Sequence, residues 1–338
     1  MRIPLFLVKV FNYEYWPWWL FYLPMTPYWL YQAVRAKSLT FFTAVNPGIV
    51  AGGFYGEHKI EIIKHISSEY LAKTIFIPLD TAFEELPKLL INNVLQYPII
   101  AKPNIGERGT LVAKIHSVVE LYQYHQSANA DYLIQEFITY PIELGVLFSR
   151  MPTDKIGKVS SVTLKEFLSV TGDGKSTIEE LVLQNTRARF QLKSLQKRLG
   201  KSMQNVLSLG ENYLLEPIGN HCRGTKFVNA NHLINNQLHE VISKVSEGFD
   251  GFYYGRFDMK VESIDDLYEG KNIRIMELNG VSSDPGHIYD PRYYLWQAYS
   301  DLMWHWKRAA DISIINQKKG TKPLAFSRIL AIVQEHFL

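Results

Sequence analysis

The sequence has little of the chemistry that marks several common protein classes. Its 338 residues include one cysteine, Cys222, which excludes an intrachain disulfide and is typical of a protein of the reducing cytoplasm. It contains no HExxH or CxxC motif, so no zinc site is predicted. Basic and acidic residues nearly balance, 36 against 33, so electrostatics gives no reason to expect a nucleic-acid partner.

Charge is also missing from one stretch near the N-terminus. No Asp, Glu, Lys or Arg lies between Glu14 and Arg35, and the stretch is rich in Trp, Tyr, Phe and Pro. Its length would span a bilayer, but prolines break a regular helix, and Trp and Tyr favour the membrane interface. Three interpretations stay open: packing on the protein's own core or on a second subunit, peripheral membrane contact through residues 13–34, and a true span.

The rest of the chain alternates between apolar strand patterns and amphipathic helix patterns, which predicts an α+β fold with largely antiparallel sheets. We expect an aromatic-rich segment over 1–40, an α/β region over 41–95, a main domain over 96–315 and a C-terminal helix over 316–338. The predicted strands cover 41–45, 74–78, 97–103, 110–115, 132–138, 142–150, 158–170, 252–261 and 272–279. The main predicted helices cover 57–70, 82–94, 117–128, 176–204, 231–249 and 293–315.

The strands at 252–261 and 272–279 carry polar residues at alternating positions. If they form an antiparallel hairpin with Asp258 opposite Glu277, the same register places Arg256 opposite Asn279. Two opposed carboxylates repel each other unless a cation or a shared proton lies between them. Mg²⁺ suits such a site because it prefers oxygen ligands and takes one or two carboxylates. The alternative is a solvated face whose charges only keep the hairpin soluble.

These residues resemble the Arg-x-Asp and Glu-x-Asn metal motifs of ATP-grasp enzymes, such as D-alanine–D-alanine ligases. Three further segments follow the family's order: 97–109 resembles the lysine and glycine loop over the nucleotide phosphates, 132–146 the adenine hinge, and 162–182 a central segment of cyanophycin-synthetase-like ligases. The resemblance implies an ATP-grasp fold, with the nucleotide held between two α+β subdomains behind a short α/β N-terminal region. It also implies an ATP- and Mg²⁺-dependent ligase that joins a carboxylate to an amine through an acylphosphate.

The resemblance further implies roles for particular residues. Arg256 would stabilise the transferring phosphoryl group, and the cofactors would be ATP and Mg²⁺, with Mn²⁺ as the alternative metal. The metal ligands would be Asp258, Glu277 and Asn279, and the ATP contacts would be Lys102 and Lys165 at the phosphates, Glu136 and Ile138 at adenine, and Glu143 at ribose. Whether Gln135 or Glu136 takes the adenine-facing role stays open.

The substrate end of the site is less specified. Asp284, His287 and Asp290 follow the second strand and are either lining residues of the acceptor pocket or a simple turn before a helix. The expected partners are a small-molecule carboxylate and an amine, and no nucleic acid. Two other functions stay open: an ATP-grasp kinase for a small molecule, and a non-catalytic ATP-binding module whose N-terminus binds a membrane or a partner.

Overall fold

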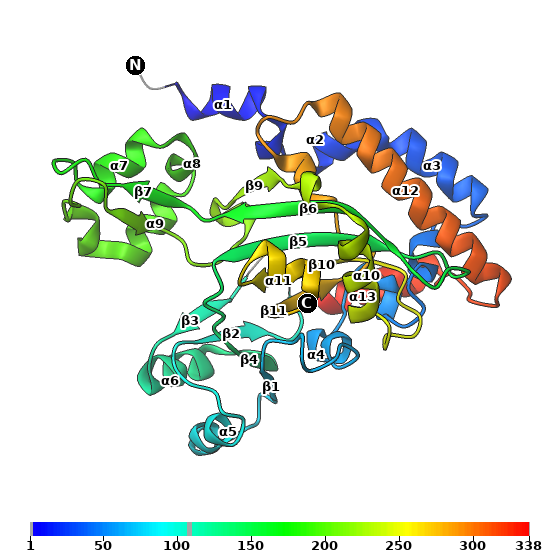
Figure 1. Ribbon diagram of the computed structural model, residues 1–338, viewed down its shortest axis with the longest axis horizontal. Helices are drawn as coiled ribbons and strands as arrows, with labels where there is room; N and C mark the ends of the chain where they lie inside the picture. Colours follow the sequence, from blue (N-terminus) through cyan, green and yellow to red (C-terminus); the bar gives the residue numbers. More distant parts are fainter. Residues whose placement is uncertain (1–2, 107–109, 338) are drawn as a thin grey trace.

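A five-stranded antiparallel sheet lies at the centre of the computed structural model, which describes residues 3–106 and 110–337 (Figure 1). Its central strand is buried almost throughout, as its nearly continuous apolar run requires. In spatial order the strands are β11 (Ile273–Asn279), β10 (Tyr254–Val261), β5 (Ile142–Ser149), β6 (Lys158–Glu166) and β9 (Lys226–Asn229).

The two faces of this large sheet differ in chemistry. On one face Phe148, Phe257 and Met259 form an apolar core with three helices, α4 (Lys59–Ile63), α10 (Asn236–Val245) and α11 (Ile264–Glu269). The alternate residues of the same strands, among them Glu143 and Asp258, point to the opposite face. Polar groups are thus sorted to the face that the three helices do not cover.

A second, four-stranded antiparallel sheet lies below the first in Figure 1. Leu86, Leu90 and Leu121 of its helices bury its apolar side. The elements are β1 (Thr74–Ile77), β4 (Tyr132–Glu136), β2 (Ile99–Pro103) and β3 (Ala113–Ile115) in spatial order, with α5 (Leu86–Asn92) and α6 (Val118–Ser127). The α+β fold with antiparallel sheets, expected from the sequence, is confirmed.

The predicted helical region 176–204 is divided into three helices, which pack on a two-stranded sheet. Asn185 causes the first division: its backbone is extended, and its side chain accepts hydrogen bonds from the amides of Arg187 and Ala188, which begins a new helix. The elements are β7 (Ser169–Thr171), β8 (Asn212–Leu214), α7 (Ile178–Gln184), α8 (Thr186–Arg189) and α9 (Leu192–Leu199).

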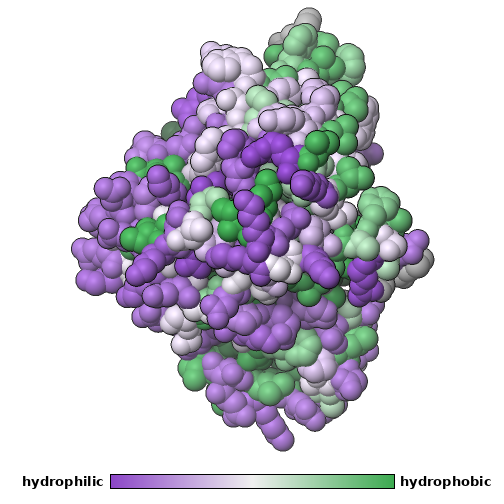
Figure 2. All heavy atoms as spheres, turned by 90° about the vertical axis from the view of Figure 1, so that its right-hand side faces the viewer, coloured by the Kyte–Doolittle hydropathy of each residue, from purple (hydrophilic) through white to green (hydrophobic). Residues whose placement is uncertain are grey.

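The aromatic N-terminal segment packs on the chain's own core. It forms α1 (Leu5–Phe11), α2 (Trp18–Tyr22) and α3 (Thr26–Arg35), and α2 and α3 lie along α12 (Leu295–Lys318). Phe21 and Met25 are buried against Leu302. Hydrophobic side chains remain exposed near the top of the molecule, where α1 lies (Figure 2). Within the described ranges, no helix is both long and apolar enough to cross a bilayer.

Other predicted elements also differ in the structure. The strand expected at 41–45 is a short 3-10 helix, η3 (Phe41–Ala44), because Ser313 and Asn316 of α12 donate side-chain hydrogen bonds to its carbonyls, which therefore need no neighbouring strand. The helix expected over 57–70 is limited to α4, because Tyr70 instead joins the edge of the large sheet by accepting a hydrogen bond from Ile275 N. The last helix is α13 (Phe326–Phe337).

Candidate active site

One cleft of about 1670 Å³ lies between the two sheets, and all nine residues predicted to contact ATP, the metal or the transferring phosphoryl group line it. Arg256, Asp258, Glu143 and Lys165 reach it from the large sheet. The other five predicted residues at the cleft are Lys102, Glu136, Ile138, Glu277 and Asn279. Residues far apart in the sequence therefore converge on one space. Residues 107–109 of the predicted phosphate loop lie outside the described residues.

The carboxylate hairpin has the predicted register. Asp258 pairs with Glu277 and Arg256 pairs with Asn279, and a bulge follows Asp258. The guanidinium of Arg256 donates two hydrogen bonds to Asp258, from Nε at 3.0 Å and from Nη2 at 3.1 Å. Asn279 Nδ2 donates a third at 3.2 Å. Side chains of the same hairpin therefore neutralise the charge of Asp258, so its carboxylate is stable beside Glu277.

A second cation also contacts this carboxylate. Lys165 Nζ lies 3.4 Å from Asp258 Oδ1 and 3.1 Å from Glu143 Oε1. Burial raises the pKa of Asp258, but Arg256 and Lys165 outweigh that effect and hold it below its usual value. Burial lowers the pKa of Lys165, and the two carboxylates more than reverse this. The group is thus a buried network in which each charge has an opposite partner.

Gly145 of β5 leaves the space that this network needs. It lies directly opposite Asp258 in the sheet. A Cβ atom there would lie 3.2 Å from Asp258 Oδ1 and 3.3 Å from Arg256 Cδ, closer than most real contacts. A side chain here would press on the Arg256–Asp258 pair, which favours glycine in the middle of a buried strand, where the residue is otherwise unfavourable.

Glu143 lies between two lysines. Besides its contact with Lys165, its Oε2 lies 3.9 Å from Lys260 Nζ, which also donates to the carbonyl of Ile138 at 3.1 Å. Burial lowers the pKa of Lys260. Glu143, predicted as a ribose contact, is thus also the counter-ion of Lys165. Lys260 ties it to the hinge segment around Ile138.

Lys102 reaches across from the small sheet to the large one. Its Nζ donates to Gln135 Oε1 at 3.1 Å and to the carbonyl of Met276 at 2.9 Å. Burial lowers its pKa to about 8, partly offset by Glu277. Glu136 is the last residue of β4, and its side chain accepts a hydrogen bond from Lys73 N at 2.8 Å. Of the two hinge candidates, Gln135 is the one that contacts Lys102.

Lys59 is a site residue that sequence reasoning missed. Its Nζ lies 3.6 Å from Glu277 Oε1 and donates to the carbonyl of Gly106 in the predicted phosphate loop. It begins α4, far in the sequence from every motif, and no local pattern distinguishes it from the other lysines of that region. It adds a positive charge beside the predicted metal ligands.

The residues present fit a magnesium ion. Among the described residues, no three His, Cys, Asp or Glu side chains gather into a metal site. The predicted set has only two carboxylates, Asp258 and Glu277, with Asn279. That number suits Mg²⁺, which completes its shell with water and phosphate oxygens. Asn279 donates from its amide nitrogen, so its oxygen remains as a ligand atom.

Of the three candidate acceptor residues, the structure brings only Asp284 to the cleft. Its carboxylate accepts hydrogen bonds from the hydroxyls of Tyr22 and Tyr289. His287 is buried elsewhere, between Ser161 and Asp301. Asp290 pairs with Arg292 and caps a backbone amide of β9. His287 and Asp290 therefore stabilise the fold and do not line the cleft.

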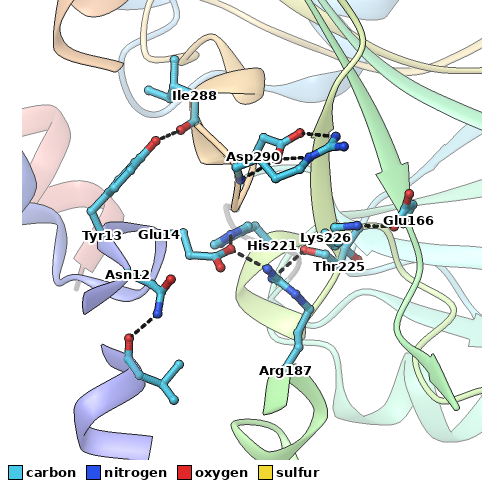
Figure 3. Close-up of polar contacts among 12 residues, drawn as sticks. Asn12, Tyr13, Glu14, Glu166, Arg187, His221, Thr225, Lys226, Ile288 and Asp290 are labelled. Carbon is cyan, nitrogen blue, oxygen red and sulfur yellow. Dashed lines mark hydrogen bonds and ion pairs between the residues drawn. The ribbon is translucent and has the colours of Figure 1, made fainter. Parts of the chain in front are cut away.

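The N-terminal segment is joined to the site region by the ion pair in Figure 3. Glu14 lies 2.5 Å from Arg187 Nη2 and 3.3 Å from His221 Nε2. Burial raises the pKa of Glu14, but His221 and Arg187 together lower it by more, so the net shift is downward. His221 belongs to the loop 219–224 and lines the cleft together with Glu14. This contact fixes the start of the aromatic segment against the site.

Comparison with known proteins gives structural neighbours alone. No family model and no curated protein matches the chain. The D-alanine–D-alanine ligase of Bacillus anthracis is 14% identical, with 78% of this chain and 69% of that chain covered and a TM-score of 0.40. The VanG D-Ala:D-Ser ligase of Enterococcus faecalis is 15% identical, with 76% and 62% covered and a TM-score of 0.41.

A bifunctional glutathione synthetase from Pasteurella multocida is 11% identical, with 73% of this chain covered and a TM-score of 0.38. Ligases of the family that the motifs resemble are thus among the neighbours. The chain spans 35% of the glutathione synthetase and 62% of VanG. Since all three TM-scores lie below 0.5, the proposals below rest on the chain's own side chains.

Proposed function

We propose that the protein is an ATP- and Mg²⁺-dependent ligase that joins a carboxylate to an amine. The observation that carries this is the buried network of Arg256, Lys165 and Asp258, which faces Lys102 across one cleft. Cations converge there from two sheets, as an anionic, multiply charged group such as a triphosphate requires. Side chains that neutralise and position charge thus dominate this end of the cleft.

The proposed reaction has two balanced steps. A carboxylate oxygen attacks the γ-phosphorus of ATP, and ADP leaves with the electrons of the broken P–O bond. An amine then attacks the acyl carbon, inorganic phosphate leaves, and the amine nitrogen loses a proton. Neither step needs a nucleophilic side chain, since positioning and charge stabilisation supply most of the catalysis.

Each cation has a distinct task in this proposal. Lys102 and Lys165 would hold phosphate oxygens, and Arg256 would stabilise charge on the transferring group. Two hydrogen bonds to Asp258 hold Arg256 at the cleft, and at least one of the four contacts of that carboxylate would give way when Asp258 binds a metal ion. Bound Mg²⁺, held by Asp258, Glu277 and Asn279, would supply further charge neutralisation.

The nucleotide base would lie beside the hinge. Ile100 and Met276 line the cleft together with Ile138, and they offer apolar contact for a purine. Lys260 orders the hinge by its bond to the Ile138 carbonyl.

We further propose that the enzyme works in the cytoplasm, in peripheral contact with a membrane through residues 13–34.

A hydroxylamine trap tests the reaction. The protein is incubated with ATP, Mg²⁺ and pooled carboxylates, and ADP and hydroxamate are assayed together. We expect the two products to rise together and both to be lost in Asp258→Asn and Glu277→Gln. Lys226→Met is the matched control, because Lys226 pairs with Glu166 on the surface and does not line the cleft.

Each other outcome has a definite meaning. Full activity of Asp258→Asn and Glu277→Gln at limiting Mg²⁺ would refute the metal assignment. A stable phosphorylated product without hydroxamate would show that the protein is a kinase. Nucleotide binding without either product, across all the carboxylates, would favour a regulatory ATP site.

A further inference from the structure

The end of the cleft beyond Arg256 is walled by aromatic and aliphatic side chains. We name this part the aromatic chamber, and the residues that define it come from the N-terminal segment, η3 and α12: Trp16, Phe21, Trp29, Phe42, Leu302 and Trp306. Aromatic side chains offer large apolar contact areas at a small cost in conformational entropy. A polar substrate alone would leave most of this wall without a partner.

Several polar groups beside the chamber are already paired within the protein. Tyr22 and Tyr289 both donate to Asp284. Tyr254 OH and His305 Nδ1 lie 3.1 Å apart. Burial lowers the pKa of His305 to about 3, so this imidazole is neutral. The chamber therefore presents apolar surface to a ligand, with few polar groups left to bind one.

The chamber is continuous with the catalytic network. Arg256 and Asp284 line the same cleft as the aromatic rings. Burial raises the pKa of Asp284, and the positive charge of Arg256 partly offsets this. Tyr22, which donates to Asp284, stacks on Trp306 with ring centroids 6.1 Å apart. One ligand can thus place a polar end at Arg256 and Asp284 and an apolar end among the aromatic rings.

The chamber also continues to the outer surface. Trp18 lines the cleft, yet it is 64% exposed. Next to it in the sequence, Trp19 is 54% exposed and Leu23 is 63% exposed. Between residues 3 and 39 the acidic side chain is Glu14, which is held by Arg187 and is largely buried. An apolar, non-acidic surface at a chamber opening favours entry of an apolar chain from a lipid–water interface.

We propose that one of the two substrates is an amphiphile, with its reacting carboxylate or amine at Arg256 and Asp284 and a hydrocarbon chain in the aromatic chamber. This inference rests on the proposed ligase function, because that function supplies the reacting group. Arg256 would favour a carboxylate and Asp284 would favour an amine. In either case the hydrocarbon chain of the substrate lies in the aromatic chamber.

Binding measured without turnover tests this. Linear alkyl carboxylates and linear alkylamines of increasing chain length, kept below their micellar concentrations, are titrated into the full-length protein by calorimetry with ADP present. Each added methylene should tighten binding about three- to fourfold until the chamber is filled. The series with the steeper dependence identifies the amphiphilic substrate.

Two variants locate the chain. Ala309→Leu adds bulk at the chamber wall and should weaken long-chain ligands at least tenfold while short-chain ligands are unchanged. Phe42→Ala removes one wall and should flatten the dependence on chain length, so a folding defect in the first variant does not end the test. Val34→Ser is the control, since Val34 is exposed and does not line the cleft.

The outcomes separate this inference from the proposed function. Affinity that does not change with chain length, with ADP binding intact, would overturn the amphiphile and leave the ligase standing. If affinity depends on alkyl-chain length equally in wild type and in both chamber variants, the hydrocarbon chain does not bind in the aromatic chamber. Affinity that rises with chain length in a protein that does not bind ADP would support the chamber and refute the nucleotide site.

Discussion

Burial lowers the pKa of Lys102 to about 8, and this makes the proposed nucleotide site sensitive to pH. Lys59 adds to the lowering, whereas the carboxylates of Glu277 and Asp258 oppose it. A phosphate placed at the ammonium group would favour the charged form and raise the pKa. Nucleotide binding should therefore draw a proton from the buffer near pH 8.

The size of the effect follows from this pKa. If the charged lysine alone binds phosphate, about nine tenths of the protein is competent at a pH one unit below the pKa, and about one tenth at one unit above. The affinity for ADP should therefore fall about tenfold between these pH values, which is about 1.4 kcal/mol. At the pKa itself, binding should take up about half a proton.

Calorimetry in buffers of different ionisation enthalpy measures both quantities, with ADP as the ligand and EDTA present so that no divalent cation adds charge. Lys102→Arg is the matched control, because arginine stays charged and should bind ADP without proton uptake. Proton uptake that is equal in wild type and Lys102→Arg would refute the assignment. An affinity for ADP that does not vary with pH would refute the assumption that only the charged form of Lys102 binds phosphate.

Folding stability should respond to pH in the opposite direction from binding. Lys102 has a lower pKa in the folded protein than the usual 10.5, so the unfolded chain holds more protons between about 8 and 10.5. Its contribution therefore stabilises the folded protein as pH rises through this range. Urea unfolding of wild type and Lys102→Met across that range isolates the contribution of Lys102.

Three further predictions concern other parts of the molecule. Gly145→Val should lower kcat/KM at least tenfold in a protein that still folds, because its side chain would displace the adjacent Arg–Asp pair, and unchanged turnover would contradict this. Phe21→Ala should cost about 3–5 kcal/mol in urea unfolding, because Phe21 is buried in the N-terminal core, whereas Val34→Ala on the surface should cost less than about 0.5 kcal/mol. Full-length protein should float with anionic liposomes and Trp19→Ser should float less, because Trp19 is exposed on the segment 13–34; equal flotation of the two would remove Trp19 from the contact.

The carboxylate hairpin could be predicted from sequence because its information is local. Strand alternation fixes which residues share a face, and one pairing then determines the next, so Asp258 opposite Glu277 implied Arg256 opposite Asn279. The same local logic missed the short helix α11 inside the connector, where the Ser263 side chain caps the helix by accepting a hydrogen bond from Asp266 N. The register survived because α11 folds between the strands without changing their pairing.

The rest of the site depends on contacts between distant segments. Nothing around Lys59 or Lys165 in the sequence shows that one lies beside Glu277 and the other beside Asp258. The aromatic segment is recognisable by composition, but composition alone does not show that one of its faces lines the cleft. Tertiary packing determines which face lines the cleft, and it also determines that the predicted strand forms η3 instead.

The N-terminal segment also sets the order in which the site is completed during synthesis. Tyr13 bonds to Ile288, which is 275 residues later, and Arg35 bonds to Asp311, which is 276 residues later. Translation at about 5–20 residues per second would leave this aromatic stretch without α12 for tens of seconds. Contacts this remote in sequence slow folding and leave apolar surface open to chaperones or a membrane. The aromatic wall of the cleft is therefore synthesised before α12 and packs against it only after α12 has been made.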